Sequence, residues 1–269
     1  MKKMLIAFAI TLVVATTVIT NADAVSVRVG SAEVKKDDVI FMNSTTYVSL
    51  RTMSNLLCPE AAVSWSGGQA IINAPLVSIT SRPGNLFIQA NGRYLYAVGG
   101  VKLISSRTYV PVRALAKAFG ASVTWDSAAQ KAIVARGSGT ISSGDQYYSS
   151  DYVYWLSRII NAESSGESML GKIAVGDVIL NRVASSDYPN TIYDVIFDTK
   201  YGVQFEPIVN GAIYQTPSSD SVIAAKLCLD GATVVGSCQY FFNPATASSS
   251  WIAQNCTYYC TIGNHVFYA

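Results

Sequence analysis

Residues 151–184, DYVYWLSRIINAESSGESMLGKIAVGDVILNRVA, decide the fold of the C-terminal half of this chain. From Tyr152 onward, apolar residues recur at positions i, i+3, i+4 and i+7, which predicts an amphipathic helix over 151–163. Residues 164–166, Ser-Ser-Gly, end that helix. The segment 167–184 is apolar on nearly all sides and predicts a buried central helix, so the pattern is typical of a small helical domain.

Two carboxylates lie four residues apart in this apolar stretch. Glu163 falls on the apolar face at the C-terminal end of the first helix, where burial and the helix dipole both raise a carboxyl pKa. A carboxyl group that stays protonated near neutral pH can act as a general acid on a glycosidic oxygen. From spacing alone, a Glu163 that reaches solvent or pairs with Arg158 fits equally well. Glu167 matches, with Ser164, the S-x-x-E capping box, and we predict that it caps the second helix.

The N-terminal half repeats itself. TTYVSLRTMSNLLCPEAAVSWSGGQAIINA at 45–74 aligns with RTYVPVRALAKAFGASVTWDSAAQKAIVA at 107–135. Each unit predicts a strand, a turn, a second strand, a short helix and two further strands around a tryptophan. Such units stack to share a core, and we expect the aligned Trp65 and Trp125 to be core residues. The predicted fold of this half is a strand-rich α+β repeat domain.

The first 24 residues predict a secretory signal peptide. Lys2 and Lys3 precede an apolar run over 4–19, and an A-x-A signal predicts cleavage after Ala24. The alternative is an uncleaved membrane anchor, although the run is shorter than the ~20 residues that a membrane span needs. No other segment is long and apolar enough to span a bilayer. We therefore expect a secreted protein with no stable membrane span after cleavage.

The segment 137–150, GSGTISSGDQYYSS, is rich in Gly and Ser and predicts a flexible linker. It divides the mature chain into a repeat domain at 25–136 and a second domain at 151–269. No acid/base constellation stands out in the first domain, so the chemistry is expected in the second.

Composition excludes several functions. The formal net charge of +2, with 13% charged residues, is too balanced for nucleic-acid binding. His265 is the only histidine, and copper and zinc sites that need several histidine ligands are therefore disfavoured. We expect no metal and no cofactor. A Cys–His peptidase would have to use His265 and is a poor alternative.

Four of the five cysteines lie close to the C-terminus. An exported protein can form disulfides, and we predict two of them in this region. An extended segment would separate Cys256 and Cys260 by ~13 Å, so we favour pairing each with Cys228 or Cys238. Cys58 is then left over.

The motif TYVPVRALAKAFGASVTWD…KAIVA resembles the copper-amine-oxidase N-terminal-like domain, a non-catalytic module of secreted bacterial cell-surface proteins. The resemblance covers about 28–136. It implies a wall-binding or positioning role, and copper is not implied.

The motif AESSGESMLGKIAVGDVILNRVASSDYPNTIYDVIF, followed by VQFEP and YFFNPATASSSWI, resembles the cell-wall hydrolases of the spore cortex-lytic SleB/CwlJ type. This resemblance covers about 153–268. It implies a lysozyme-like, mostly α domain that cleaves peptidoglycan glycan strands by lytic transglycosylation with one Glu. By motif position that residue is Glu163. A His is frequent in the family where this chain has Asn161.

With that resemblance, we expect a sugar-binding groove in which aromatic rings stack on sugar faces and amides read N-acetyl groups. The predicted lining residues are Gln204, Phe205, Glu206, Tyr214, Tyr240, Phe242 and Asn243. A muramidase-type hydrolase with Glu163 as acid and Glu206 as base is one alternative, and a non-catalytic wall-binding protein is another. The sequence leaves open whether the substrate is spore cortex or vegetative wall, the oligomeric state, and any accessory wall protein.

Overall fold

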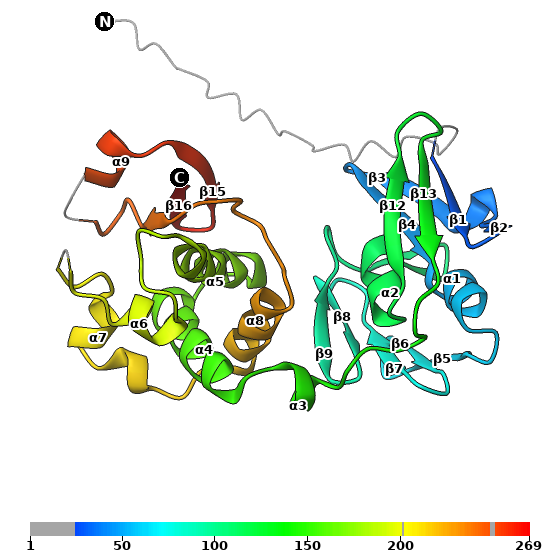
Figure 1. The fold of residues 1–269 in the computed structure, drawn as a ribbon, viewed down its shortest axis with the longest axis horizontal. Helices are drawn as coiled ribbons and strands as arrows, with labels where there is room; N and C mark the ends of the chain where they lie inside the picture. The colour runs from blue at the N-terminus through cyan, green and yellow to red at the C-terminus, as the bar shows by residue number, and fades with distance from the viewer. Residues whose placement is uncertain (1–24, 201, 248–250) are drawn as a thin grey trace, which may run out of the picture.

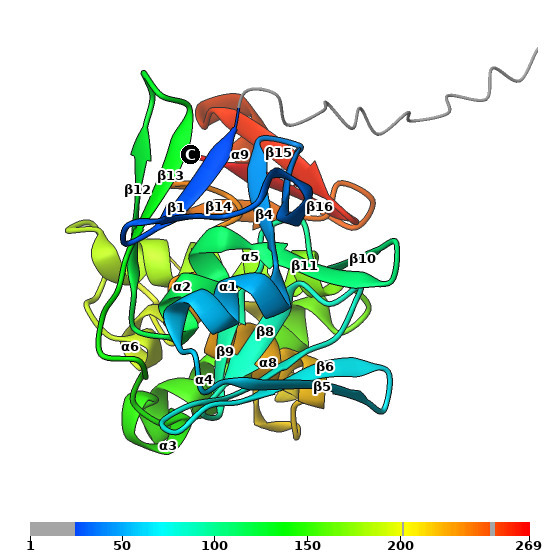
Figure 2. The same ribbon diagram turned by 90° about the vertical axis from the view of Figure 1, so that its right-hand side faces the viewer.

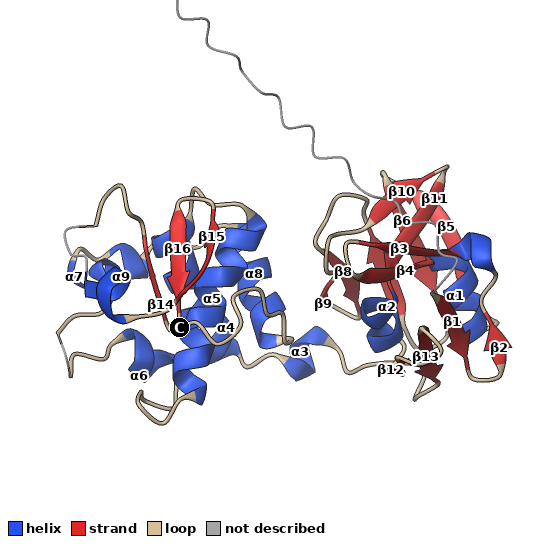
Figure 3. Cartoon of the chain, turned by 90° about the horizontal axis from the view of Figure 1, so that it is seen from above, coloured by secondary structure: helices blue, strands red, loops and turns tan. Residues whose placement is uncertain are grey.

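The computed structural model describes residues 25–200, 202–247 and 251–269. The predicted signal peptide at 1–24 lies outside the described residues. A strand-rich N-terminal half lies beside a helical C-terminal half (Figures 1 and 3). In the part of the chain that is described, no helix has the length and apolar character needed to cross a membrane.

From residue 25 onward, the N-terminal half consists of two short α-helices, a 3-10 helix and three sheets. Figure 2 shows the helices between the sheet that contains β1 and β13 and the one that contains β5 and β6. The sheet orders are β12-β13-β1-β2, β10-β11-β4-β3 and β5-β6-β7-β8-β9. The elements are β1 (Ser26–Val29), β2 (Ala32–Glu33), η1 (Lys36–Asp38), β3 (Val39–Met42), β4 (Thr45–Ser49), α1 (Leu50–Leu57), β5 (Ala62–Ser66), β6 (Gln69–Asn73), β7 (Ser78–Ser81), β8 (Phe87–Ala90), β9 (Arg93–Tyr96), β10 (Lys102–Ile104), β11 (Arg107–Pro111), α2 (Val112–Ala118), β12 (Ser122–Asp126) and β13 (Lys131–Ala135).

The predicted repeat is visible as two hairpin–helix–hairpin units. Strands β4 and β11 pair antiparallel with Val48 opposite Val110, so the two units meet at equivalent residues. In each unit the structure has a two-stranded hairpin where the sequence predicted one second strand. Residues 43–44 and 105–106, which adopt positive φ, form the turns of these two hairpins. Asn-Ser and Ser-Ser are weaker turn signals than Asn-Gly, which is why the sequence did not reveal these hairpins.

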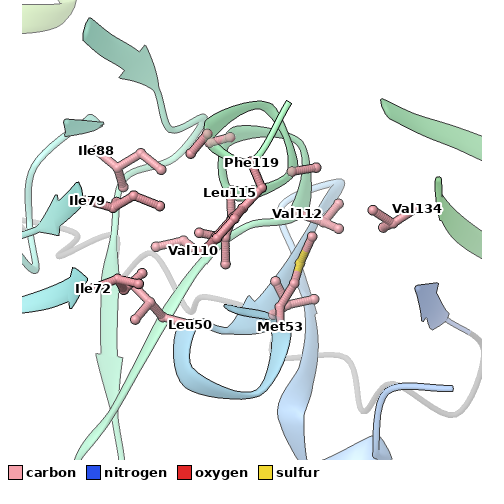
Figure 4. Close-up of a cluster of buried hydrophobic side chains, with 14 of the residues drawn as sticks. Leu50, Met53, Ile72, Ile79, Ile88, Val110, Val112, Leu115, Phe119 and Val134 are labelled. Carbon is pink, nitrogen blue, oxygen red and sulfur yellow. The ribbon is translucent and has the colours of Figure 1, made fainter. Parts of the chain in front are cut away.

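Aliphatic residues from α1, α2 and the sheets form the core of this half (Figure 4). The prediction that the aligned tryptophans belong to it is wrong: Trp65 is 51% exposed and Trp125 is 39% exposed. They lie on β5 and β12, which are edge strands of their sheets, so a neighbouring strand covers each only on one side. The aligned Tyr47 and Tyr109 are buried.

The C-terminal half is built around one central helix, α5, which packs against α4 and α8. Both helices predicted from the sequence are present, and each begins on a serine cap, Ser149 for α4 and Ser168 for α5. A sheet of order β14-β16-β15 completes the half. The elements are α4 (Ser150–Ser164), α5 (Met169–Ala184), α6 (Ile192–Ile196), α7 (Glu206–Val209), η2 (Ala212–Tyr214), α8 (Ser219–Leu229), β14 (Tyr240–Phe242), α9 (Trp251–Asn255), β15 (Tyr258–Ile262) and β16 (His265–Tyr268).

The linker at 137–150 is packed against the N-terminal half and contains the short helix α3 (Gly144–Tyr147). The side chain of Asn91 donates hydrogen bonds to Thr140 Oγ1 and to the carbonyl oxygen of Ile141, each at 3.1 Å. Gly144 lies so close to the Gly92 carbonyl that a Cβ at 144 would come within 2.5 Å of its oxygen. The prediction of a flexible linker is therefore wrong, because its glycine at 144 lets the segment pack closely against the N-terminal half.

A buried ion cluster joins the two halves. Asp230, at the end of α8, accepts hydrogen bonds from Arg93 Nε at 2.8 Å and Arg93 Nη2 at 2.7 Å, and it lies 2.6 Å from Lys117 Nζ. The Tyr148 hydroxyl also donates to it at 3.1 Å. The rings of Phe87 and Tyr94 pack against the core of the C-terminal half. The two halves therefore form one packed unit.

All five cysteines are free thiols, so the predicted disulfides are not formed. Cys228 faces α5, where its Sγ contacts the backbone of Ile173, and this orientation directs it into the helical core. Cys238 is buried beside Phe267, with Cys260 packed against the same small cluster. Burial raises the pKa of Cys238 to about 11, so the thiol is its stable form near neutral pH.

Candidate active site

A groove of about 1210 Å³ runs along one face of the C-terminal half, and Glu163 lies in its wall. Glu163 occupies the last turn of α4, where the apolar face of that helix turns toward α5. Strand β14 and the segment before α7 supply further residues of the groove wall. The described lining consists of Glu163, Arg182, Ser186, Asp187, Tyr188, Asp198, Lys200, Gln204, Phe205, Glu206, Gln239, Tyr240, Phe241, Phe242, Asn243, Thr246, Ala247, Trp251, Ile252 and His265.

Burial raises the pKa of Glu163 to about 7, the negative charge of Glu206 adds to the rise, and the positive charge of Arg182 opposes it. Among the described residues, no hydrogen-bond or ion-pair partner holds the Glu163 carboxyl. The pairing with Arg158 that the sequence allowed is not formed, because that guanidinium stacks over the Tyr154 ring at 3.6 Å. Glu163 is therefore a carboxyl group that can hold a proton near neutral pH and release it into the groove.

Glu167 has a different role from the predicted capping box. Ser168 caps α5, and its hydroxyl accepts a hydrogen bond from the backbone N–H of Gly171. The Glu167 carboxylate instead accepts hydrogen bonds from Asn264, through Nδ2 at 2.8 Å and through the backbone N–H at 3.3 Å. The Glu167 carboxylate lies against Gly263 in the β15–β16 turn, and a Cβ atom at position 263 would collide with it. The capping prediction is wrong, and the contact it missed joins residues 97 positions apart.

Six of the seven predicted groove residues line the groove with Glu163. Strand β14 presents Tyr240 and Phe242, and Asn243 follows them. Phe205 is largely buried and also belongs to the helical core. Tyr214 is the exception: it lies on η2, is 61% exposed and is absent from the groove lining. Gln204 and Glu206 complete the set at the entrance to α7.

Sequence reasoning missed Arg182, which is 5% exposed at the end of α5 and lines the groove. Its Nε donates to the carbonyl oxygen of Gln239 at 2.7 Å. Burial lowers the pKa of this guanidinium, and the nearby Tyr188 and Tyr240 oppose that shift, followed by Asp198 and Glu163. An arginine within an almost wholly apolar helix is a signal that could have found it, because buried cations need a specific reason.

His265 and Trp251 were also missed as lining residues. His265 is buried against the Phe241 ring at a centroid distance of 5.3 Å, and burial lowers its pKa. Trp251 meets the Tyr240 ring at 6.2 Å and extends the aromatic wall. None of the described lining residues is a cysteine, so the groove gives no support to a Cys–His peptidase.

Two polar residues of α5, Asp177 and Asn181, make hydrogen bonds that hold the fold. Asp177 accepts backbone N–H bonds from Val234 and Val235, and Asn181 donates to the carbonyl oxygens of Gly236 and Cys238. Asn161 accepts hydrogen bonds at the start of α8 and is absent from the groove lining. Within the described ranges, no cluster of three or more His, Cys, Asp or Glu residues could hold a metal ion.

The fold and the groove together define a strand-rich repeat domain packed on a helical domain that carries a partly buried carboxyl group. Residues 166–268 match the family described as Cell Wall Hydrolase, and residues 27–134 match the Copper amine oxidase N-terminal domain. The C-terminal half therefore carries a cell wall hydrolase domain, and a copper amine oxidase N-terminal domain precedes it. Glu163 lies just ahead of the first matched range.

Several known proteins are similar to the C-terminal half of the chain. The chain is 38% identical over 120 residues to the spore cortex-lytic enzyme of Bacillus cereus, which covers 45% of each chain. It is 32% identical over 120 residues to that of Bacillus subtilis, which covers 45% of this chain and 38% of the relative. The chain thus spans less than half the length of these curated relatives. It is also 36% identical to the solved catalytic domain of the germination-specific lytic transglycosylase SleB from Bacillus anthracis, over 48% of this chain and all of that one, with a TM-score of 0.42.

Proposed function

We propose that this protein cleaves the glycan strands of peptidoglycan as a lytic transglycosylase, with Glu163 as acid and then as base. The observation that carries the proposal is a partly buried, unpaired Glu163 whose pKa is raised to about 7 in the wall of a large groove. The similarity to spore cortex-lytic enzymes supports the same substrate class.

In the first step, Glu163 donates its proton to the oxygen between N-acetylmuramic acid and N-acetylglucosamine. The bond from C1 of the muramic residue to that oxygen breaks, and the N-acetylglucosamine leaves with a new hydroxyl group. In the second step, the C6 hydroxyl of the muramic residue attacks its own C1, and Glu163 takes the released proton. The product carries a 1,6-anhydro ring, no water is consumed, and the carboxyl group is restored.

The rest of the groove suits a polymer of N-acetylated sugars. Tyr240, Phe242 and Trp251 offer ring faces and edges for sugars, while Gln204 and Asn243 offer amide donors and acceptors. A single acid with no metal is sufficient for this chemistry, in keeping with our expectation that the enzyme uses no cofactor.

A muramidase-type hydrolase is the second candidate, because Glu206 lies in the same groove and its charge acts on Glu163. Hydrolases usually use two carboxylates, one as acid and one as base or nucleophile. Glu206 is exposed and would have to activate a water molecule.

Mass spectrometry of the muropeptides released from purified cortex and from vegetative wall separates these functions. The proposal predicts anhydro-ended products, one water lighter than reducing-end products, and no release by the Glu163→Gln variant. Reducing ends that incorporate oxygen from labelled water would establish the hydrolase instead. Pelleting with insoluble wall and no release of fragments would show a wall-binding protein. The two substrates tested in parallel also decide between cortex and vegetative wall.

For the N-terminal half we propose a wall-positioning role. Trp65 and Trp125 are exposed at equivalent places in the two repeats, and a second groove of about 790 Å³ lies beside Trp65. Because the two halves pack together around Asp230, binding of the N-terminal half to the wall would hold the helical half close to its substrate. Replacing both tryptophans by Ala in the full chain should slow the digestion of insoluble wall severalfold and leave the digestion of soluble glycan strands unchanged. Equal slowing on both substrates would contradict positioning.

We also propose that the protein is secreted and acts in the cell wall or spore cortex. The signal-peptide pattern at 1–24 and the cell wall hydrolase family support this location. N-terminal sequencing of the exported protein should begin at Val25, and a start at Met1 in a membrane fraction would show an uncleaved anchor.

A further inference from the structure

Arg182 is a buried cation for which the proposed mechanism has no role. It lies on the last turn of α5, where a positive charge is favoured by the helix dipole. Three aromatic rings surround its guanidinium carbon, Tyr188 at 5.1 Å, Phe205 at 5.2 Å and Tyr240 at 5.6 Å. Together with the bond from Nε to Gln239, these rings fix the guanidinium plane in the groove wall.

The Nη1 atom of Arg182 is buried and has no hydrogen-bond partner among the described residues. A buried donor left unsatisfied destabilises a protein, so such a group needs a reason. Arg93 provides the contrast within the same molecule, because its Nε and Nη2 both donate to the Asp230 carboxylate. Arg93 is thus a structural arginine, whereas Arg182 keeps a donor free beside the acid of the groove.

The chemistry of the groove indicates what this donor would meet. The buried Nη1 atom of Arg182 is the donor that lacks a partner, and a single carbonyl oxygen is enough to accept a hydrogen bond from it. The groove is also rich in negative charge, which disfavours an anionic ligand. Even with Glu163 protonated, the carboxylates Asp187, Asp198 and Glu206 outnumber the cations Arg182 and Lys200 in the described lining. A neutral carbonyl oxygen fits one charged donor in such a groove.

We propose that Arg182 Nη1 donates a hydrogen bond to an amide carbonyl oxygen of the glycan strand and so makes Arg182 a specificity-determining residue of the groove. The inference rests on the proposed function, since it takes a glycan as the ligand. Two amides of that polymer have the required chemistry, the N-acetyl group of the sugars and the lactam of modified muramic residues.

Binding is measured by calorimetry in the full chain with the Glu163→Gln change, which prevents turnover. The ligands are glycan oligosaccharides in three forms: N-acetylated, chemically N-deacetylated, and lactam-bearing with the other sugars N-deacetylated. Adding Arg182→Met should weaken the binding of the form that carries the recognised amide by ~10–100-fold, the range for a hydrogen bond from a charged donor. On a form that lacks that amide, the two proteins should bind equally.

Arg182→Lys serves as the second variant, because it keeps the charge and cannot place a guanidinium N–H at the same point. It should lose most of the same affinity. Arg158→Met is the matched control, since Arg158 also stacks on a tyrosine ring but is absent from the groove lining. It should bind all ligands as the parent does.

Three outcomes decide the inference. Loss confined to N-acetylated ligands assigns the N-acetyl carbonyl, and loss confined to lactam-bearing ligands assigns the lactam. An equal loss on all three ligands, or no loss on any, overturns the inference. Arg182-dependent binding by a protein whose wild-type form cleaves nothing would reject the proposed function and leave this inference standing.

Discussion

Glu163 and Glu167 are four residues apart, yet the structure gives them opposite surroundings. Glu163 lies partly buried at the end of α4, with no hydrogen-bond partner among the described residues, and its pKa is raised to about 7. Glu167 lies in the α4–α5 connection, and Asn264 binds its carboxylate through both the backbone and the side chain. The difference teaches that a carboxyl group buried without a partner is poised for chemistry, whereas a carboxylate whose oxygens are bonded holds the fold.

The largest effect is expected from Glu163→Gln. The amide keeps the shape of the side chain but cannot donate the acid proton, so the rate of fragment release from soluble glycan strands should fall by ~10³-fold or more. Glu167→Gln should stay within about fivefold of the wild-type rate, because the amide oxygen can still accept a bond from Asn264. An inactive Glu167→Gln beside an active Glu163→Gln would reverse the assignment.

The next effect concerns stability. A Glu163 pKa of about 7 lies above the ordinary value of 4.5, so the folded state holds a proton that the unfolded state releases. The stability from that proton is present below pH 4.5 and is lost as the pH rises to 7. Glu163→Gln should therefore be more stable than wild type by ~1–3 kcal/mol at pH 8, and this difference should shrink at pH 4. Urea unfolding at both pH values measures it, and a difference independent of pH would count against a raised pKa.

Glu206 should tune the acid. Its negative charge raises the Glu163 pKa, so Glu206→Gln should lower that pKa and move the alkaline limb of the kcat/KM profile to lower pH. The limb should still be visible, since burial is the larger cause. Asp194→Asn is a matched surface control, because its carboxylate bonds Thr191 outside the groove. An unmoved limb would show that Glu206 does not act on Glu163.

The smallest effect is expected at the structural carboxylate. Asn264→Ala removes the side-chain bond to Glu167 and should cost ~0.5–1.5 kcal/mol of unfolding free energy, with activity nearly unchanged. A double-mutant cycle with Glu167→Ala isolates the pair. A coupling energy of zero would mean that the contact does not stabilise the β15–β16 turn.

Local patterns in the sequence predicted the elements that depend on neighbouring residues. The apolar spacing along 151–184 located α4 and α5, and it placed Glu163 on the buried face. It could not show that Asn264, 97 residues later, would bind Glu167, because only tertiary packing brings the two together. For the same reason, the aligned Trp65 looked like a core residue until the sheet order placed it on an edge strand.

The groove shows the same limit. Tyr214 has the residue type of a sugar-binding aromatic, but η2 holds it outside the groove. Arg182 belongs to the groove, and its presence in a mostly apolar helix was a signal that the sequence analysis did not use. Six of the seven residues predicted with the help of the family resemblance line the groove, three of them at the start of α7 and three along or just after β14. For Tyr214 and Arg182, only the structure shows which of the two side chains lines the groove.

The most direct test of the account is the pKa of the Glu163 carboxyl group in the folded, full-length protein. Carbon-detected NMR of the side-chain carboxyl resonances, assigned by comparison with Glu163→Gln, follows the titration from pH 3 to pH 9. The account predicts a midpoint of about 7 for Glu163. A midpoint at or below the ordinary 4.5 would contradict it, because an ionised Glu163 could not be the acid of the groove.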